Sequence, residues 1–196
     1  MTSQRFYILN CDGIHPIAKI NNPVIKNTQL PWTSGEKINT TVEQPIVYLI
    51  DASKLDCSDE ELEDQDLKGY QADDFNIPNL WTYLNPPLIC KKLTDIITSF
   101  EHVNIELFEA EVINSKSGTC HKDYFAFNLL QIAEDEVARQ LQREVNQRTI
   151  RVHSELYPVF YLYTDGPLIV NETVKYAIEK AQIDGVYFEL TSDYGS

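Results

Sequence analysis

The chain has 196 residues, of which 43% are hydrophobic and 11% aromatic, enough for one sizeable core or for two small lobes that share one. Thirty acidic residues against sixteen basic ones give a formal net charge of −14, which repels nucleic-acid phosphates and anionic lipid and attracts basic partners. No apolar run approaches the roughly 20 residues of a membrane-spanning helix, and the start "MTSQRFYILNCDG" lacks the pattern of a signal peptide, so we expect a cytoplasmic protein.

Two short strands are predicted in the first part of the chain, at 5–9 ("RFYIL") and 45–50 ("PIVYLI"), because both are rich in β-branched and aromatic residues. The intervening stretch 21–41 is rich in Pro, Asn and Thr and is expected to be an irregular surface segment. Residues 51–74 then hold ten acids and two lysines. A solvated loop with one short helix, capped at Ser58, is the structure that this acidic run favours.

One sequence unit occurs twice, as "PPLICKKLTDIITSFEHVNIELFEA" at 86–110 and "GPLIVNETVKYAIEKAQIDGVYFEL" at 166–190. Each copy is predicted to form a strand, a helix and a second strand. Each helix has apolar residues at i, i+3, i+4 and i+7, which make one apolar face about 100° wide. These residues are Leu93, Ile96, Ile97 and Phe100 in the first copy and Val174, Ala177, Ile178 and Ala181 in the second. True duplication and independent selection for packing both remain open.

The helix ends differ between the two copies. Asn171 is a good N-cap for the second helix, and Asp184-Gly185 is a good stop. Cys90 or Lys91 at the matching place in the first copy is a poor cap.

Further elements are predicted between the two copies. Residues 121–132 favour a strand, and 134–148 favour an exposed helix with a narrow apolar stripe. Residues 149–153 and 158–165 supply one or two more strands. The expected fold is therefore α+β, with a mixed or antiparallel sheet and two similar strand–helix–strand units whose helices pack on it. Residues 1–80, the N-terminal strands and acidic segment, belong to the same domain as 81–196 or form a small lobe beside it.

Motifs that would indicate catalysis are missing from the sequence: there is no Gly-rich dinucleotide or phosphate loop, no H-E-x-x-H and no G-x-S-x-G. The cysteines Cys11, Cys57, Cys90 and Cys120 are scattered and are expected to be free thiols. Cys120 and His121 are adjacent, so on a strand they point to opposite faces and could not easily share a metal ion. We therefore expect no cofactor, no metal and no catalytic residue.

Two glutamates, Glu109 and Glu189, occupy matching places in the two copies. They could face one another as a general acid–base pair if the units pack about a pseudo-twofold axis. The alternating strands around them favour solvated side chains instead.

A family resemblance rests on the C-terminal pattern "VFYLYTD", "PLIV", "NETVKYAIEKAQIDG" and "VYFEL", together with "RFYIL" and "PPLICKKLTDIITSFEHVNIELFEAEV". Over roughly residues 80–190 the chain resembles the immunity-protein-eleven family of bacterial polymorphic toxin systems. It departs from that pattern at Cys90 and Lys91, where such proteins tend to have a small polar cap. The acidic run 51–74 has no clear counterpart in the family.

The resemblance implies a non-enzymatic inhibitor that protects the producing cell by binding a cognate toxin, which in such systems is often a nuclease with a basic cleft. An acidic protein is attracted to such a cleft at long range. The densest charge on the chain is the expected contact surface, with two nearby aromatics as anchors. These residues are Asp59, Glu60, Glu61, Glu63, Asp64, Asp66, Tyr70 and Trp81.

Two other functions remain open on the sequence. The first is a small hydrolase or transferase that uses scattered acids or Cys120, which a concave pocket with several titrating groups would favour. The second is a general protein-interaction module without a toxin partner.

Overall fold

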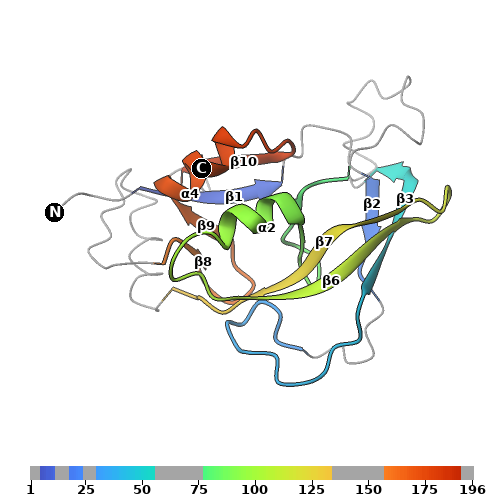
Figure 1. Cartoon of the computed structure of the whole chain (residues 1–196), viewed down its shortest axis with the longest axis horizontal. Coiled ribbons are helices and arrows are strands. Elements are labelled where there is room, and N and C mark those ends of the chain that lie inside the picture. Colours follow the sequence, from blue (N-terminus) through green and yellow to red (C-terminus); the bar gives the residue numbers. More distant parts are fainter. Residues whose placement is uncertain (1–4, 12–17, 24–29, 56–76, 134–156, 191–196) are drawn as a thin grey trace.

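Figure 1 shows a computed structural model of the chain, described here for residues 5–11, 18–23, 30–55, 77–133 and 157–190. These residues form ten strands in two sheets and two short helices, so the fold is mostly β and broadly α+β. The sequence predicted this class, although it left open whether the strands make one sheet or two.

The smaller sheet is antiparallel and has the strand order β10-β1-β9-β8. Its central strand β1 (Phe6–Cys11) pairs with β9 (Leu168–Asn171) on one side and with β10 (Val186–Leu190) on the other. The strand β8 (Val159–Tyr161) forms the outer edge beside β9. The predicted strands at 5–9 and 158–165 are therefore confirmed as β1 and β8.

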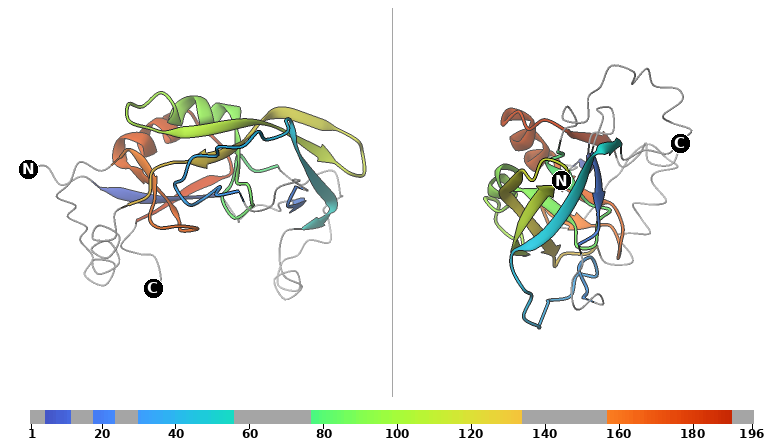
Figure 2. Two further views of the ribbon diagram at one scale, coloured as in Figure 1. Left: turned by 90° about the horizontal axis from the view of Figure 1, so that it is seen from below. Right: turned by 90° about the vertical axis from the view of Figure 1, so that its right-hand side faces the viewer.

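The larger sheet is mixed, strongly curved and has the order β2-β3-β6-β7-β5-β4 (Figures 1 and 2). The bounds of its strands are β2 (Ala18–Asn21), β3 (Ile46–Leu55), β4 (Leu80–Trp81), β5 (Leu88–Cys90), β6 (Ile105–Asn114) and β7 (Cys120–Leu129). Only β3 and β6 run parallel, and the other pairs are antiparallel. The predicted strands at 45–50 and 121–132 are β3 and β7, whereas β2 was not predicted.

The two repeated units have the same arrangement in space. The first runs through β5, α2 (Lys91–Ile97) and β6, and the second through β9, α4 (Glu172–Lys180) and β10. In each unit the two strands are separated by a third strand, β7 or β1, that is antiparallel to both. The helices lie side by side and cover neighbouring parts of the two sheets (Figure 1).

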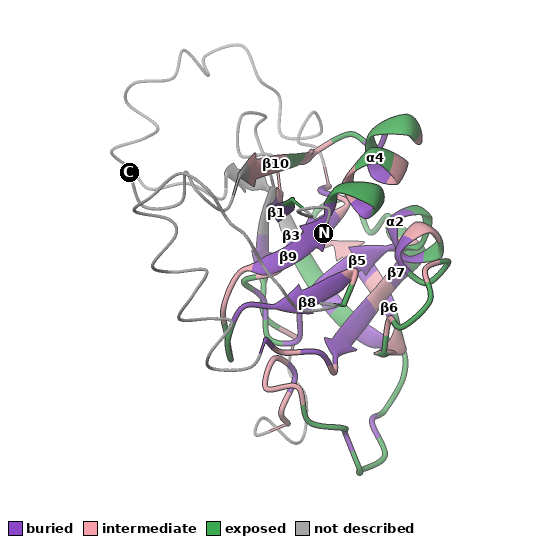
Figure 3. Ribbon diagram, turned by 90° about the vertical axis from the view of Figure 1, so that its left-hand side faces the viewer, coloured by how far each residue is buried: buried purple, intermediate pink, exposed green. Residues whose placement is uncertain are grey.

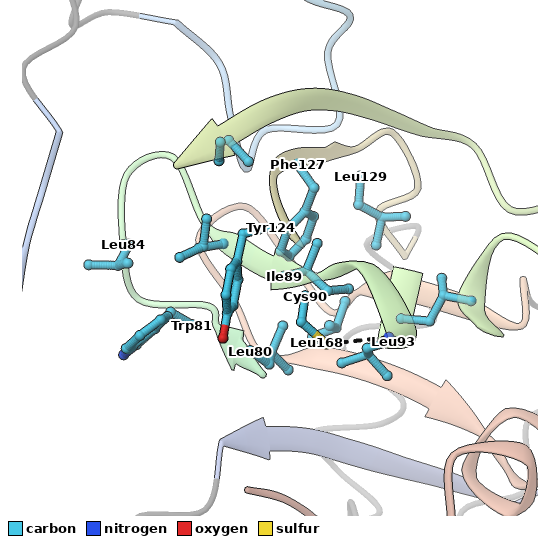
Figure 4. Close-up of a cluster of buried hydrophobic side chains, with 14 of the residues drawn as sticks. Leu80, Trp81, Leu84, Ile89, Cys90, Leu93, Tyr124, Phe127, Leu129 and Leu168 are labelled. Atoms are coloured by element: carbon cyan, nitrogen blue, oxygen red, sulfur yellow. Dashed lines mark hydrogen bonds between the residues drawn. The ribbon is translucent and has the colours of Figure 1, made fainter. Parts of the chain in front are cut away.

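One large buried cluster fills the space between the sheets and the helices. Figure 4 shows part of it, where side chains from β4, β5, β7, β9 and α2 converge. Residues from both 1–80 and 81–196 contribute to this cluster, including Tyr48 of β3 and Trp81 of β4, which are both completely buried. The predicted apolar helix faces point into it through Leu93 and Ile97 of α2 and through Val174 and Ile178 of α4.

The segment 21–41, described at 21–23 and 30–41, is irregular beyond the last residue of β2 and lies largely at the surface, as its composition predicted, but it also supplies side chains to the core. Trp32, Ile38 and Val42, which follows the segment, are all buried in the large cluster, and the Trp32 ring stands edge-on to Phe108 with 5.0 Å between centroids. The sequence did not indicate these buried side chains, because single apolar residues among many polar ones have no periodic spacing that would mark them as core residues. Residues 30–41 therefore pack against β6 through the contact of Trp32 with Phe108.

The first helix begins with an unusual cap. The Cys90 Sγ accepts a hydrogen bond from the Leu93 N–H at 3.4 Å, so the residue that the sequence rated a poor cap does occupy the N-cap. Sulfur is a weak acceptor, but Cys90 is also buried in the core, and its burial raises the pKa of the thiol. Packing therefore decides this position, and capping is secondary.

The second helix begins as predicted at Asn171, whose Oδ1 accepts from the Val174 N–H at 2.9 Å. It ends earlier than the predicted stop at Asp184-Gly185, because Lys180 is its last residue and Gln182 has a φ of 50°. A left-handed residue just after a helix turns the chain away from it, and the strand β10 follows.

Replacement of Asn171 by alanine is expected to lower the free energy of unfolding by about 1 kcal/mol, because the Val174 N–H loses its acceptor. Asn171→Ser keeps a capping oxygen and should retain most of that stability. Urea denaturation monitored by circular dichroism measures both variants. Equal losses for alanine and serine would show that packing around Asn171, and not its cap, sets the stability.

Candidate functional site

The outer face of the mixed sheet carries apolar side chains where a solvated sheet would carry polar ones. Along β3 the side chains alternate, with Ile46, Tyr48 and Ile50 buried and Val47 and Leu49 exposed by 39% and 46%. Side chains on a strand point alternately to opposite faces of the sheet. Val47 and Leu49 therefore lie on the face opposite to Ile46, Tyr48 and Ile50, which we call the outer face.

The neighbouring strands extend this outer face. Val47 pairs with Glu111 and Leu49 with Ile113 of β6, and paired residues share one face of a sheet. Glu109, two residues before Glu111, is on the same face and pairs with Phe125 of β7. We name these six residues the outer-face patch: Val47, Leu49, Glu109, Glu111, Ile113 and Phe125.

The helices leave this patch open. In Figures 1 and 2 the helix α2 lies over one end of β6 and β7, while β3 and the tip of the β6–β7 hairpin extend away from both helices. Figure 3 shows that the outer sides of α2 and α4 are themselves exposed. Beneath α2 the same face is buried and is part of the large cluster, as at Phe127 and at Ile89, which pairs with Phe125.

Acidic groups and one lysine border the apolar residues of the patch. The Lys122 Nζ lies 2.9 Å from the Glu111 Oε1, and this hydrogen bond lowers the pKa of the Glu111 carboxyl and raises that of Lys122. Cys120 is exposed beside them, and loss of hydration followed by the charge of Glu111 raises the pKa of its thiol. Glu109 and Asp123 add two further exposed carboxylates.

Removal of the Lys122 amine in Lys122→Ala is expected to return the pKa of Glu111 upward to its ordinary range. Because that pKa is lowered in the folded protein, the ion pair stabilises the fold above the ordinary carboxyl pKa. The stabilisation is lost as the pH falls through the lowered value. An NMR titration of the Glu111 side chain measures this shift. Lys92→Ala, an exposed lysine on α2, is the matched control and should leave the Glu111 titration unchanged.

A concave feature lies between α4 and β10. It is an open groove of about 340 Å³ lined by Lys175, Ile178, Glu179, Gln182, Ile183, Val186, Tyr187 and Phe188. The Lys175 amine spans it, because it forms an ion pair with Glu179 and stands 5.1 Å from the ring centre of Tyr7 and 5.3 Å from that of Phe188. The groove's one lysine is thus already engaged by a carboxylate and two rings.

Most of the predicted contact residues lie outside the described part of the chain. These are Asp59, Glu60, Glu61, Glu63, Asp64, Asp66 and Tyr70. The eighth, Trp81, is described and is completely buried in β4, where it pairs with Leu88. Its side chain therefore packs in the core and cannot contact a partner in this structure. The sequence indicated it as an anchor because it is an aromatic residue near the acidic run, and nearness along the chain does not show which side chains are buried.

The other polar residues named from the sequence, Glu109, Glu189, Cys120 and His121, differ in their exposure and in the strand that carries them. Glu109 is exposed, as the alternation of its strand predicted, while Glu189 is half-buried on β10 of the other sheet. Burial, and then the charge of Glu189, raise the pKa of its neighbour Tyr187. Cys120 pairs with Ile113 and His121 with the buried Val112, so the two point to opposite faces as predicted.

The three described cysteines, Cys11, Cys90 and Cys120, form no disulfide bond, as expected, and Cys57 lies outside the described residues. Within the described ranges no group of three or more His, Cys, Asp and Glu side chains is arranged to hold a metal ion. Neither described helix has the length and apolar character needed to span a bilayer. The predicted helix at 134–148, the strand at 149–153 and the helix capped at Ser58 also fall outside these ranges.

No protein-family model matches the chain, and a search of curated proteins finds no match.

Proposed function

We propose that the protein is a cytoplasmic immunity protein that binds a cognate bacterial toxin domain and neutralises it by occluding a basic active cleft. The observation that carries this proposal is the imbalance of charge. The chain has a formal net charge of −14, and residues 56–76 alone hold nine acids and one lysine. Charge of one sign raises the rate at which an oppositely charged partner is captured and disfavours partners of the same sign.

Other features support an inhibitor that acts by binding. The resemblance to the immunity-protein-eleven family rests largely on the two strand–helix–strand units, whose shared residues are packing residues apart from the glutamate at positions 109 and 189. We propose that these units are a duplicated scaffold that presents a binding surface. The acidic residues from Asp59 to Asp66, with Tyr70, remain the proposed electrostatic part of that surface.

The test uses the toxin domain encoded beside the gene for this chain. Mixing the two purified proteins at low salt is expected to give a stable complex, and co-expression should rescue cells that produce the toxin. Because exposed charges are screened by salt, the affinity should fall as salt is added. No complex at low salt together with no rescue would refute the function. An affinity that does not change with salt would remove only the electrostatic part.

A further inference from the structure

The outer-face patch needs a physical explanation, because exposed apolar residues sit in the middle of a sheet. Solvated faces of antiparallel and mixed sheets normally carry polar residues at every second position. On the interior strand β3 those positions hold the exposed Val47 and Leu49 instead, and the neighbouring strand β6 adds the half-buried Ile113 next to Glu109 and Glu111. A contiguous apolar patch with a polar border is typical of a protein–protein contact.

The charges at the border decide which partner fits. Glu109 of β6 and Asp123 of β7 are exposed carboxylates, and Glu111 of β6 forms an ion pair with Lys122. A second copy of this chain would bring the same carboxylates and a net charge of −14 against them, which is repulsive. Nucleic-acid phosphates and anionic lipids are repelled for the same reason.

We infer that the outer-face patch is the docking surface for the toxin, and that the toxin meets it with an apolar centre flanked by lysine or arginine side chains. This inference rests on the proposed function and deepens it, because it places the energetic centre of the contact on β3, β6 and β7. The apolar side chains supply the buried contact, and Glu109 and Glu111 orient the basic partner around them.

The decisive variant is Leu49→Arg, which places a cation in the centre of the patch at a position that is 46% exposed and outside the core. Affinity for the same toxin domain, measured by calorimetry, should fall by about 30-fold or more, as for loss of a central contact residue. Tyr176→Arg is the matched control: it changes the charge equally, at an even more exposed position (68%) on α4. It should bind like the unmodified chain.

A second pair of variants tests the charged border. Glu109→Lys should weaken binding and reduce its dependence on salt. Glu101→Lys, which makes the same change at an exposed site in the turn between α2 and β6, should do neither. Thermal unfolding of each variant verifies that the fold is intact. If Leu49→Arg unfolds the chain, Leu49→Thr, which keeps a β-forming residue, takes its place with a smaller expected loss of affinity.

The possible outcomes separate this inference from the proposed function. Toxin binding that is lost in Leu49→Arg and kept in Tyr176→Arg supports both. Toxin binding that is unchanged in every patch variant would overturn the inference that the patch is the docking surface, and it would leave the proposed inhibitor function intact. No toxin binding by the unmodified chain overturns both. A homodimer in solution that dissociates in Leu49→Arg would also overturn the inference, because a second copy would then occupy the patch.

Discussion

Replacement of Trp81 by alanine is expected to lower the free energy of unfolding by about 3–5 kcal/mol, the range for removal of a buried aromatic side chain. Trp81 is completely buried and belongs to the cluster that joins the two sheets. The alanine variant leaves a cavity between β4 and the rest of the core. Closing that cavity would require β4 and the surrounding core side chains to move. Urea denaturation at pH 7 measures the loss.

Two further variants separate the packing contribution of the Trp81 ring from the effect of its indole N–H and from the effect of removing any large aromatic side chain. The Trp81 Nε1 is buried and has no hydrogen-bond partner in the described structure. Trp81→Phe therefore removes a polar group that gains nothing from the fold, and its cost should be well under half that of Trp81→Ala. Tyr176→Ala, at a side chain that is 68% exposed, should change stability by less than about 0.5 kcal/mol. A Trp81→Ala variant as stable as Tyr176→Ala would contradict the core position of Trp81.

The second large effect is expected at Asn128, a completely buried amide on β7. Its Nδ2 donates to the Glu36 backbone carbonyl at 2.8 Å and to the Glu106 Oε2 at 2.9 Å. The same Glu106 oxygen accepts the Ile38 N–H at 2.9 Å. Asn128 and Glu106 thus attach the segment that carries Trp32 and Ile38 to the strands β6 and β7.

Asn128→Asp is expected to lower the free energy of unfolding by about 3–5 kcal/mol at pH 7, the cost of an uncompensated buried charge. The new carboxylate faces a carbonyl oxygen and the Glu106 carboxylate, so both its hydrogen bonds become repulsive contacts. Its pKa in the folded protein should rise above the usual value of about 3.9. A group with a raised folded pKa loses stability as the pH rises above its unfolded pKa, so the part of the deficit due to charge should shrink as the pH falls from the raised value and be gone below about pH 4.

The matched control for this variant is Asn104→Asp, because the Asn104 side chain is exposed at the start of β6. It makes the same chemical change in water and should cost less than about 0.5 kcal/mol at any pH. Guanidinium denaturation of the three proteins at pH 3.5 and pH 7 provides the comparison. A deficit for Asn128→Asp that is small and independent of pH would show that water reaches this site.

The local elements of the fold could be predicted from the sequence because their signals are local. The apolar residues of α2 and α4 recur at helical spacing, and Asn171 is a side chain that caps a helix. The two strand–helix–strand units followed from that pattern. The strand that lies between the two strands of each unit could not be predicted. The positions of β7 and β1 depend on pairing with strands far away in the sequence, and no local sequence pattern indicates that pairing.

The outer-face patch was missed for a different reason. The run Ile46-Val47-Tyr48-Leu49-Ile50 is apolar at every position, and such a run indicates a strand that is covered on both faces. Nothing in the five residues shows that only one face is covered. Glu109 and Glu111 were the available signal, since two charged residues at alternate positions of β6 mark a solvated face. That β3 lies beside β6, and that Val47 and Leu49 share the face of Glu111, follows only from the pairing of the two strands in the structure.

The central position of β1 has a consequence for how the protein is made. Its Tyr7 pairs with Val170 of β9, a residue that a ribosome adds 163 positions later, and with Leu190 of β10. At about 5–20 residues per second, this strand waits on the order of 10–30 s for either neighbour. During that time four side chains destined for the interior, Phe6, Tyr7, Ile8 and Leu9, have no sheet to enter. During synthesis the chain is therefore exposed to aggregation and proteolysis at β1. That exposure ends only when β9 and β10 of the second strand–helix–strand unit have been made and pair with β1.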